Sequence, residues 1–445
     1  MVIVQVPSDV LKVIPSSEQF SNLLLSYKRE FGALVFSDYE KLLAVFDTLN
    51  ISVSEYLELS RFLLEYVWEK LHTGHWKNVP IYWRLLYAAV RMLRAIYGTL
   101  KMYDHQIDFQ PSECLQNILE DLDYSLIMGF PIFDTLAAEL ASMLHGTLSS
   151  FVSGPSIPND PRFTQICTPN VSLDSFNKGN RTLEALERIR RPSLEKFQEL
   201  LRIGRPFILT DAMTYWPACQ PGGEHAWTVD YWSRTIGHRI VPVEIGSRYT
   251  DESWGQELMT MNRFIEQFII NPEGGSGDAS RSVGYMAQHQ LFLQIPELGR
   301  DVLTPDYCMV GGEADRHEST VDSNVWFGPP NTVSPLHHDS DRSNFLTQIN
   351  GTKYVVLYTA SETPFVYPHP ESMLCNTSEA DVEHPDFKKF PNLTLAHGFH
   401  GLLCPGEMLF IPPRCWHYIR SVSISFSVNF WWKVDESFIP PWPSD

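Results

Sequence analysis

A histidine and an acidic residue two positions apart, followed much later by a second histidine, can bind a divalent metal ion. At the end of a β-strand the first two side chains lie on one face, and the distant histidine completes a 2-His-1-carboxylate triad. This triad leaves open positions on Fe(II) for a co-substrate and oxygen. With 15 His and 53 acidic residues among 445, about two such short pairs are expected by chance, so the context of each pair must decide.

Three such pairs occur in the sequence: His337/Asp339, His369/Glu371 and His384/Asp386. The last two are interrupted by a proline and lie in turn-like sequence, which favours surface loops. The first pair ends a strand-like run that begins at Thr332. We therefore predict that His337 and Asp339 are metal ligands, the alternative being a His-His-Asp turn on the surface.

The second histidine of the triad should come from a later strand. His417 lies between two strand-like runs and is the preferred candidate, with His400, which precedes Gly401 at the start of another run, as the second choice. The alternative interpretation of His417 is a core histidine that packs beside Trp416.

A buried cation is the next feature that the sequence suggests. Two strand-like runs flank Asn350-Gly351, a dipeptide typical of a two-residue hairpin turn. In that hairpin Gln348 pairs with Lys353, and alternation puts Asn344 and Lys353 on one face. Such a lysine either protects an edge strand or waits for an anion. Beside a metal, the second interpretation fits a dicarboxylate co-substrate with one end on the metal and the other on the lysine.

The elements that would position these residues lie in the second half of the chain. Residues 1–150 have apolar positions at three- and four-residue spacing, which predicts an irregular helical domain. Residues 151–190, rich in Ser, Pro and Asn, are predicted to be a linker. Short strand-like runs dominate residues 191–445. One of them, 421–430, alternates strictly between apolar and polar residues, which predicts a half-buried strand of a β-sandwich or barrel.

Composition limits the classes of partner and of compartment. Hydrophobic residues make up 44% and aromatic residues 13% of the chain, which excludes global disorder and fibrous repeats. The net charge of −19 disfavours direct binding to nucleic acid or anionic membranes and favours basic protein segments. Seven cysteines without a CxxC pair suggest a reducing compartment. Because no long apolar run or signal segment occurs, we expect no membrane span and an intracellular location.

Several longer motifs resemble the jumonji-C (JmjC) family of Fe(II)/2-oxoglutarate oxygenases. They are Trp326-Phe-Gly-Pro, Ser334-Pro-Leu-His-x-Asp, Asn344-Phe-Leu, Gly351-x-Lys-Tyr, Pro405-Gly-Glu-Met-Leu-Phe-Ile-Pro, Trp416-His-Tyr and Phe426-Ser-Val-x-Phe-Trp-Trp432. The resemblance implies an α+β fold in which an all-α N-terminal domain precedes a double-stranded β-helix (jelly-roll) catalytic domain.

The resemblance also implies the cofactors and the residues that hold them. Fe(II) would be bound by His337, Asp339 and His417, with molecular oxygen as the oxidant. 2-Oxoglutarate would be the co-substrate and would be decarboxylated to succinate. The residues that match its binding site are Lys353 for the far carboxylate and, as hydrogen-bonding companions, Tyr285, Ser334 and Asn344.

Glu244 and Trp254 lie in a segment that resembles the substrate pocket of the arginyl-hydroxylase type in this family. A carboxylate beside an aromatic ring suits a planar, permanently charged guanidinium. The alternative is that Glu244 is an outward strand residue and Trp254 a core residue. We therefore expect hydroxylation of an arginine side chain in ribosomal or chromatin-associated proteins. The family implies a nuclear location, with the cytoplasm as a further one.

Three other functions remain open on the sequence. A lysine demethylase would use the same metal and co-substrate. A metal-dependent peptidase acting on methylated histone tails would need a metal-activated water instead. A jelly-roll binding module without catalysis is the non-enzymatic alternative, and the intact triad with Lys353 argues against it. The oligomeric state and the role of the helical domain are left undetermined by the sequence.

Overall fold

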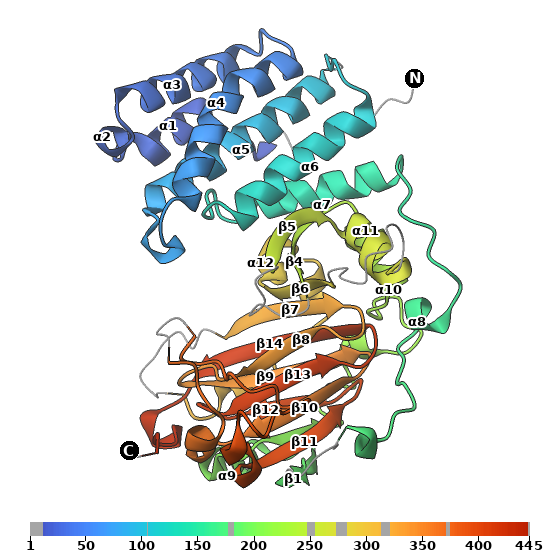
Figure 1. Cartoon of the computed structure of the whole chain (residues 1–445). Coiled ribbons are helices and arrows are strands. Elements are labelled where there is room, and N and C mark those ends of the chain that lie inside the picture. Colours follow the sequence, from blue (N-terminus) through green and yellow to red (C-terminus); the bar gives the residue numbers. More distant parts are fainter. Residues whose placement is uncertain are drawn as a thin grey trace.

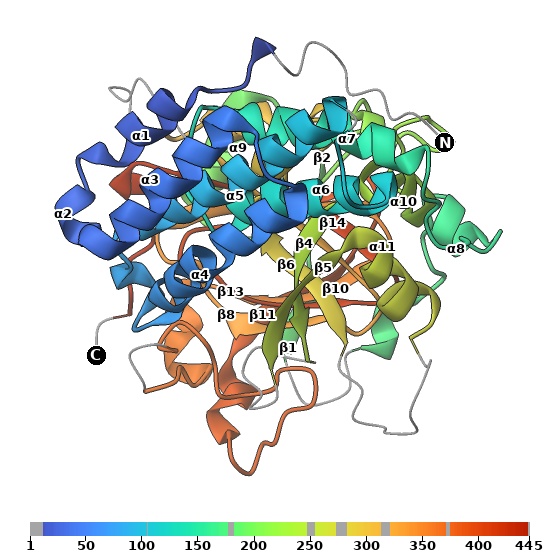
Figure 2. The ribbon, with the colours of Figure 1, turned by 90° about the horizontal axis from the view of Figure 1, so that it is seen from above.

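An N-terminal helical domain stands on one end of a two-sheet jelly roll (Figure 1). The computed structural model describes residues 12–104, 106–176, 182–246, 254–272, 283–312, 321–370 and 374–443. Viewed from above, the helices form a layer that covers this end of the jelly roll (Figure 2). The helical N-terminal region and the jelly roll together make the α+β fold that the sequence predicts.

The helical domain forms where the sequence predicts helices. Its helices are α1 (Ser17–Leu25), α2 (Lys28–Phe31), α3 (Ala33–Thr48), α4 (Val53–His72), α5 (Ile81–Tyr103), α6 (Pro111–Ile127) and α7 (Leu136–Ser149). Capping boxes at Ser16 and Ser52 satisfy backbone N–H groups at the starts of α1 and α4. Helix α5 is the central one, buried on most sides between α4 and α6. Among the described residues, no helix has the length and apolar character that a membrane span requires.

The segment after α7 crosses to the far end of the jelly roll (Figure 1). It contains a short helix, α8 (Pro161–Thr164), and a single turn at Leu173–Ser175. The last part of the predicted linker forms two strands, β1 (Thr182–Ala185) and β2 (Arg188–Arg190), which join the two sheets as parallel neighbours of β11 and β3.

Within the described residues, the strands of the jelly roll form a five-stranded and a nine-stranded sheet. The smaller sheet has the order β1, β11 (His397–Leu403), β10 (Lys353–Tyr358), β13 (Trp416–Ser421) and β8 (Val333–His337). The larger has the order β2, β3 (Phe207–Thr210), β12 (Met408–Ile411), β9 (Arg342–Asn350), β14 (Ser425–Lys433), β7 (Asp322–Gly328), β6 (Gly284–His289), β4 (Ile240–Ile245) and β5 (Gly255–Thr260).

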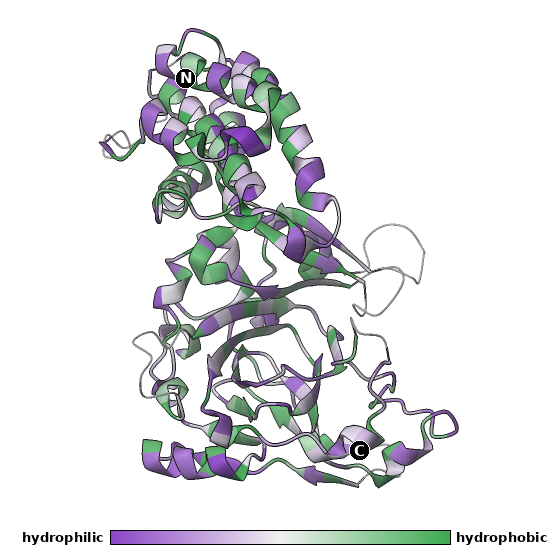
Figure 3. Ribbon diagram, turned by 90° about the vertical axis from the view of Figure 1, so that its left-hand side faces the viewer, coloured by the Kyte–Doolittle hydropathy of each residue, from purple (hydrophilic) through white to green (hydrophobic). Residues whose placement is uncertain are grey.

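Apolar side chains on both sides of the larger sheet form the cores that hold the jelly roll together. Figure 3 shows hydrophobic residues along the strands and on the inner sides of the helices. Helices α9 (Leu194–Ile203) and α10 (Val229–Ile236) contribute to a core rich in aromatic rings, among them Phe197, Trp232 and Phe426. A smaller core between the sheets includes Leu346, Val355 and Leu409.

The structure contradicts the predicted hairpin at Asn350-Gly351. Strands β9 and β10 belong to different sheets, so Gln348 does not pair with Lys353. Of the two turn residues only Gly351 has a positive φ, +75°, whereas a type I′ turn needs two. A Cβ at Gly351 would collide with the carbonyl oxygen of Ile424, so the glycine is required by close packing at a corner between the sheets.

Hydrogen bonds of the Asn350 side chain explain why the chain turns a corner here. Its Oδ1 accepts from the backbone N–H groups of Gly351 at 2.7 Å and Cys167 at 2.9 Å. Its Nδ2 donates to the carbonyl oxygens of Trp227 at 2.9 Å and Gln165 at 3.1 Å. Asn350 therefore joins the corner to the linker and to the segment before α10. These contacts are distant in sequence, so a local turn pattern does not reveal them.

The prediction of a half-buried strand at 421–430 is also wrong. The strand breaks after Ser421, and β14 is buried from Ser425 to Trp432. Its polar side chains bond to polar side chains of β9 inside the jelly roll: Ser427 donates to Gln348 at 2.7 Å, and Asn429 donates to Asn344 at 2.6 Å. The alternation thus marks a polar interior.

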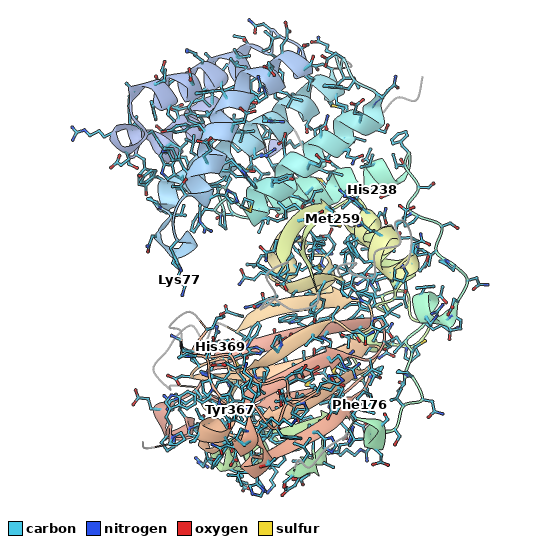
Figure 4. All side chains as sticks on the ribbon, in the orientation of Figure 1. Lys77, Phe176, His238, Met259, Tyr367 and His369 are labelled. Carbon is cyan, nitrogen blue, oxygen red and sulfur yellow. The ribbon has the colours of Figure 1, made fainter. Side chains whose placement is uncertain are left out.

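A buried ion pair joins the helical domain to the jelly roll. Asp123 of α6 and Arg239, which precedes β4, have no exposed side-chain surface, and Arg239 Nη2 donates to Asp123 Oδ1 at 2.7 Å. Asp123 also accepts from the N–H of Ile240 at 2.8 Å and from Gln294, in the short helix α12 (Leu291–Gln294), at 2.6 Å. His238 marks this junction in Figure 4.

Candidate active site

Two neighbouring strands of the smaller sheet bring the predicted metal ligands together. His337 ends β8, Asp339 follows it, and His417 is directly opposite His337 on β13. Asp339 carboxylate oxygens lie 3.8 Å from His337 Nε2 and 3.5 Å from His417 Nε2. In the described part of the chain, these three residues are the one group of histidine, cysteine and acidic side chains whose ligand atoms lie within 4.8 Å of one another.

Both histidines are oriented for metal binding by backbone carbonyl groups. The Nδ1 of His337 donates to the oxygen of Pro335 at 2.7 Å, and that of His417 donates to the oxygen of Cys415 at 3.0 Å. With the proton on Nδ1, the lone pair of each Nε2 points toward Asp339. Burial and the neighbouring His337 lower the pKa of His417 to about 4, so its imidazole is neutral, as a metal ligand must be.

Asp339 is held in place by two donors. Its Oδ2 accepts from Asn344 Nδ2 at 2.8 Å and from Trp431 Nε1 at 3.0 Å, and Asn429 in turn donates to Asn344. Burial alone would raise the pKa of Asp339, but His417 and His337 hold it below its usual value. Trp431 and Asn429 were not predicted as site residues. The alternation of residues 421–430 includes Asn429, but only the pairing of β14 with β9 shows that Asn429 and Trp431 reach the site.

The arrangement fits a first-row divalent metal such as Fe(II). Two imidazole nitrogens and one carboxylate oxygen would form the donor set. Each imidazole is oriented by a hydrogen bond from its Nδ1, which leaves Nε2 for the metal, and Asp339 is oriented by the donor on its Oδ2. Three protein ligands leave coordination positions open on the side of the pocket. The site can therefore hold a metal and a second, chelating ligand.

Lys353 lies in the same pocket as a buried cation. It is 2% exposed and sits on β10, between β11 and β13, so the edge-strand interpretation is wrong. Among the described residues it has no carboxylate partner, and its Nζ donates to Tyr285 Oη at 3.2 Å. Burial lowers the pKa of Lys353 to about 7. A buried ammonium without an anion is suited to bind the carboxylate of a ligand.

The pocket joins the triad to Lys353 and contains all the residues predicted for the co-substrate. It is lined by Tyr285, Gln288, Trp326, Ser334, His337, Asp339, Asn344, Leu346, Lys353, His417, Ile419, Asn429 and Trp431. Asn344 and Lys353 thus share a pocket as predicted, but they do so because the two sheets face each other. The side chain of Asn344 reaches Asp339, so its direct bond is to a predicted metal ligand.

The two predicted substrate residues contact each other, and one of them lies opposite Tyr285, which lines this pocket. Glu244 on β4 is directly opposite Tyr285 on β6, and Trp254 Nε1 donates to Glu244 Oε2 at 3.3 Å. Glu244 is half-buried, and burial raises the pKa of its carboxyl group, an effect that the bond from Trp254 reduces. Burial raises the pKa of the Tyr285 phenol, and the nearby carboxylate of Glu244 raises it further.

The other histidine candidates lie outside the site. His400 on β11 packs against Tyr354, whose Oη lies 3.4 Å from its Nδ1. His384 is on the surface, 3.8 Å from Asp381. His369 lies at the end of the jelly roll where the loops gather (Figure 4), and Glu371 of its pair is outside the described residues.

Comparisons with known proteins agree with this geometry. The family model described as "Cupin-like domain" matches residues 192–438. A protein named Lysine-specific demethylase 8 from Danio rerio is 37% identical over 406 residues, which cover 87% of this chain and 94% of that protein. Its namesake from Xenopus tropicalis is 37% identical over 84% of this chain and 88% of that protein. Jumonji C domain-containing protein 5 from Drosophila melanogaster is 32% identical, over 83% of this chain and 85% of that protein.

Proposed function

Since the chain belongs to the JmjC family of cupin-like oxygenases, we propose that it is an Fe(II)- and 2-oxoglutarate-dependent oxygenase that hydroxylates arginine side chains of proteins. His337, Asp339 and His417 would hold the metal. Lys353, with Tyr285, would bind the far carboxylate of 2-oxoglutarate. Bound iron supplies the oxidation of an unactivated carbon, coupled to decarboxylation of 2-oxoglutarate to succinate.

The half-buried carboxylate of Glu244 is the observation that favours arginine. One of its oxygens accepts from Trp254, and the other, which has no donor among the described residues, could accept from a guanidinium N–H. A guanidinium offers five donors in a fixed plane and stays charged at every relevant pH, whereas trimethyl-lysine has no N–H to donate. Glu244 faces the same side of the sheet as Tyr285, which lines the candidate metal pocket, and this supports a substrate side chain bound beside that pocket.

The charge of the whole chain fits a basic protein substrate. A net charge of −19 attracts arginine-rich segments over long range and speeds their encounter with the pocket. Ribosomal and chromatin-associated proteins carry such segments, and we extend the proposal to them and to a nuclear location, with the cytoplasm as a further one. Direct binding of nucleic acid is not part of the proposal.

Mass spectrometry of arginine-containing peptides tests the proposal. Purified protein with Fe(II), ascorbate and 2-oxoglutarate should add one oxygen atom to arginine and release succinate. Glu244→Gln should lose this turnover but still bind metal and 2-oxoglutarate. Glu257→Gln, an exposed glutamate on the adjacent strand β5, is the matched control and should remain active. Absence of succinate with every peptide would refute the oxygenase function and favour a binding module.

Lysine demethylation is the second candidate, because two of the relatives above are named lysine-specific demethylases. Demethylation with the same metal and co-substrate removes one methyl group from the lysine side chain and releases it as formaldehyde. Formaldehyde from methyl-lysine peptides, with no oxygen gained by arginine peptides, would replace our proposal by this one. Cleaved peptides without succinate would instead indicate a peptidase.

A further inference from the structure

We propose that Arg414 and the C-terminal tail, residues 434–443, form a clamp that holds the metal ligands in their binding geometry. Arg414 lies between β12 and β13, three positions before His417, and the loop that carries Asp339 lies beside it. The inference rests on the metal site of the proposed function, and it concerns how tightly this chain holds its metal.

Arg414 joins three segments that are distant in sequence. Its Nε donates to Asp341 at 2.6 Å, in the loop that carries Asp339. Its Nη1 donates to the carbonyl oxygen of Pro440 at 3.0 Å, in the tail, and its guanidinium lies 5.1 Å from the ring of Trp442. The side chain is only 20% exposed. A single residue thus connects the loop that carries Asp339 to the loop that leads into the strand of His417, and it ties both loops to the tail.

The tail closes over this connection from outside. It begins with a bond from the N–H of Asp435 to the oxygen of Gly311, and the ring of Phe438 lies 5.4 Å from the guanidinium of Arg202 on α9. Trp442 then packs edge-on against the ring of His338 at 4.9 Å. His338 lies between the ligands His337 and Asp339, so the tail contacts the ligand loop directly.

Backbone geometry explains why the two loops need such support. Ser340 and Arg414 both have positive φ angles, +56° and +60°, a conformation that costs residues other than glycine free energy and persists only when surrounding contacts impose it. The N–H of Arg414 donates to the oxygen of Ser340 at 2.7 Å, which joins the two strained positions. Without the clamp, each loop can relax to an ordinary conformation and separate the ligands.

The expected effect is on metal affinity. If the loops hold the binding geometry only a tenth of the time without the clamp, the apparent Kd for metal rises about tenfold. The tail is half-exposed at Trp442, which is 37% exposed, so truncation of this side chain leaves the cores of the jelly roll intact. A loss of affinity without a loss of stability therefore distinguishes positioning from general packing.

Titration of metal-free protein with Mn²⁺, an air-stable substitute for Fe(II), tests the clamp. We expect Arg414→Ala and Trp442→Ala to raise the Kd about tenfold, and Trp442→Phe to retain most of the affinity. The matched controls should stay within about twofold of the wild type: Arg205→Ala, an arginine stacked on Phe399 away from the site, and Tyr215→Ala, an exposed aromatic residue.

Three results would overturn the clamp. The first is wild-type affinity in both Arg414→Ala and Trp442→Ala. The second is a fall in metal affinity that is accompanied by a lower melting temperature of the metal-free variants than of the metal-free wild type. This result would indicate general destabilisation. The third is a wild-type protein that binds no Mn²⁺, which would remove the metal site of the proposed function itself and so separates the failure of that proposal from the failure of the clamp.

Discussion

The buried Lys353 should couple 2-oxoglutarate binding to the uptake of a proton. Burial lowers its pKa to about 7 in the ligand-free protein, but a bound carboxylate favours the charged ammonium. Binding at higher pH must therefore first protonate the lysine. The protonated fraction is about one half at pH 7 and about 3% at pH 8.5, so the apparent affinity should fall about 16-fold over this range.

Calorimetric titration of the Mn²⁺-loaded protein with 2-oxoglutarate measures this effect. At pH 8 the heat should vary with the ionisation enthalpy of the buffer and report an uptake of about 0.9 proton per ligand. Lys353→Arg is the control, because a guanidinium stays charged throughout and should flatten the pH dependence. An affinity of the wild type that is constant between pH 7 and 8.5, or an equal slope in Lys353→Arg, would refute the reasoning.

Three further outcomes follow from the contacts of the site and of the domain junction. His417→Ala should abolish metal binding and turnover with the fold retained, whereas His400→Ala should keep both; the opposite result in activity assays would show that the ligand is misassigned. Trp431→Phe removes a donor to the carboxylate ligand and should weaken Mn²⁺ binding about tenfold in the same titration. Asp123→Asn should lower the free energy of unfolding by about 3–5 kcal/mol, because it removes the closest anion of the buried Arg239 and leaves only Glu297, 3.9 Å from its Nη1; urea denaturation measures this, and an unchanged midpoint would contradict it.

The sequence could predict the three candidate metal ligands because their geometry is local. His337 and Asp339 are two residues apart at the end of one strand, and His417 lies in a short aromatic run that is easily found. No long-range pairing needs to be known to place such a pair on one face. The long motifs that resemble the JmjC family added the jelly-roll fold and the role of Lys353, which the residues alone indicate through a hairpin that the structure does not contain.

The missed features depend on contacts between distant segments. Asn350 looks like a hairpin residue, and only its bonds to Cys167 and Trp227 show that it forms a corner between sheets. The polar residues of β14 look solvent-exposed until the opposite sheet is known. Trp431, in turn, could be recognised as a partner of Asp339 only once β14 was placed beside β9. Local alternation gives the period of a strand but not the environment of each face.

The ion pair between Asp123 and Arg239 joins part of the jelly roll to the helical domain, across the boundary between the two domains. Glu244 and Tyr285 stand on β4 and β6, strands appended to one side of the larger sheet, and this extension is tied to the helical domain through Arg239 and Ile240. Of the predicted metal ligands, His337 and His417 stand on two other strands, β8 and β13. Under the proposed function, changes in the helical domain could therefore alter the position of Glu244, and with it the accepted side chain, without changing the strands that carry His337 and His417.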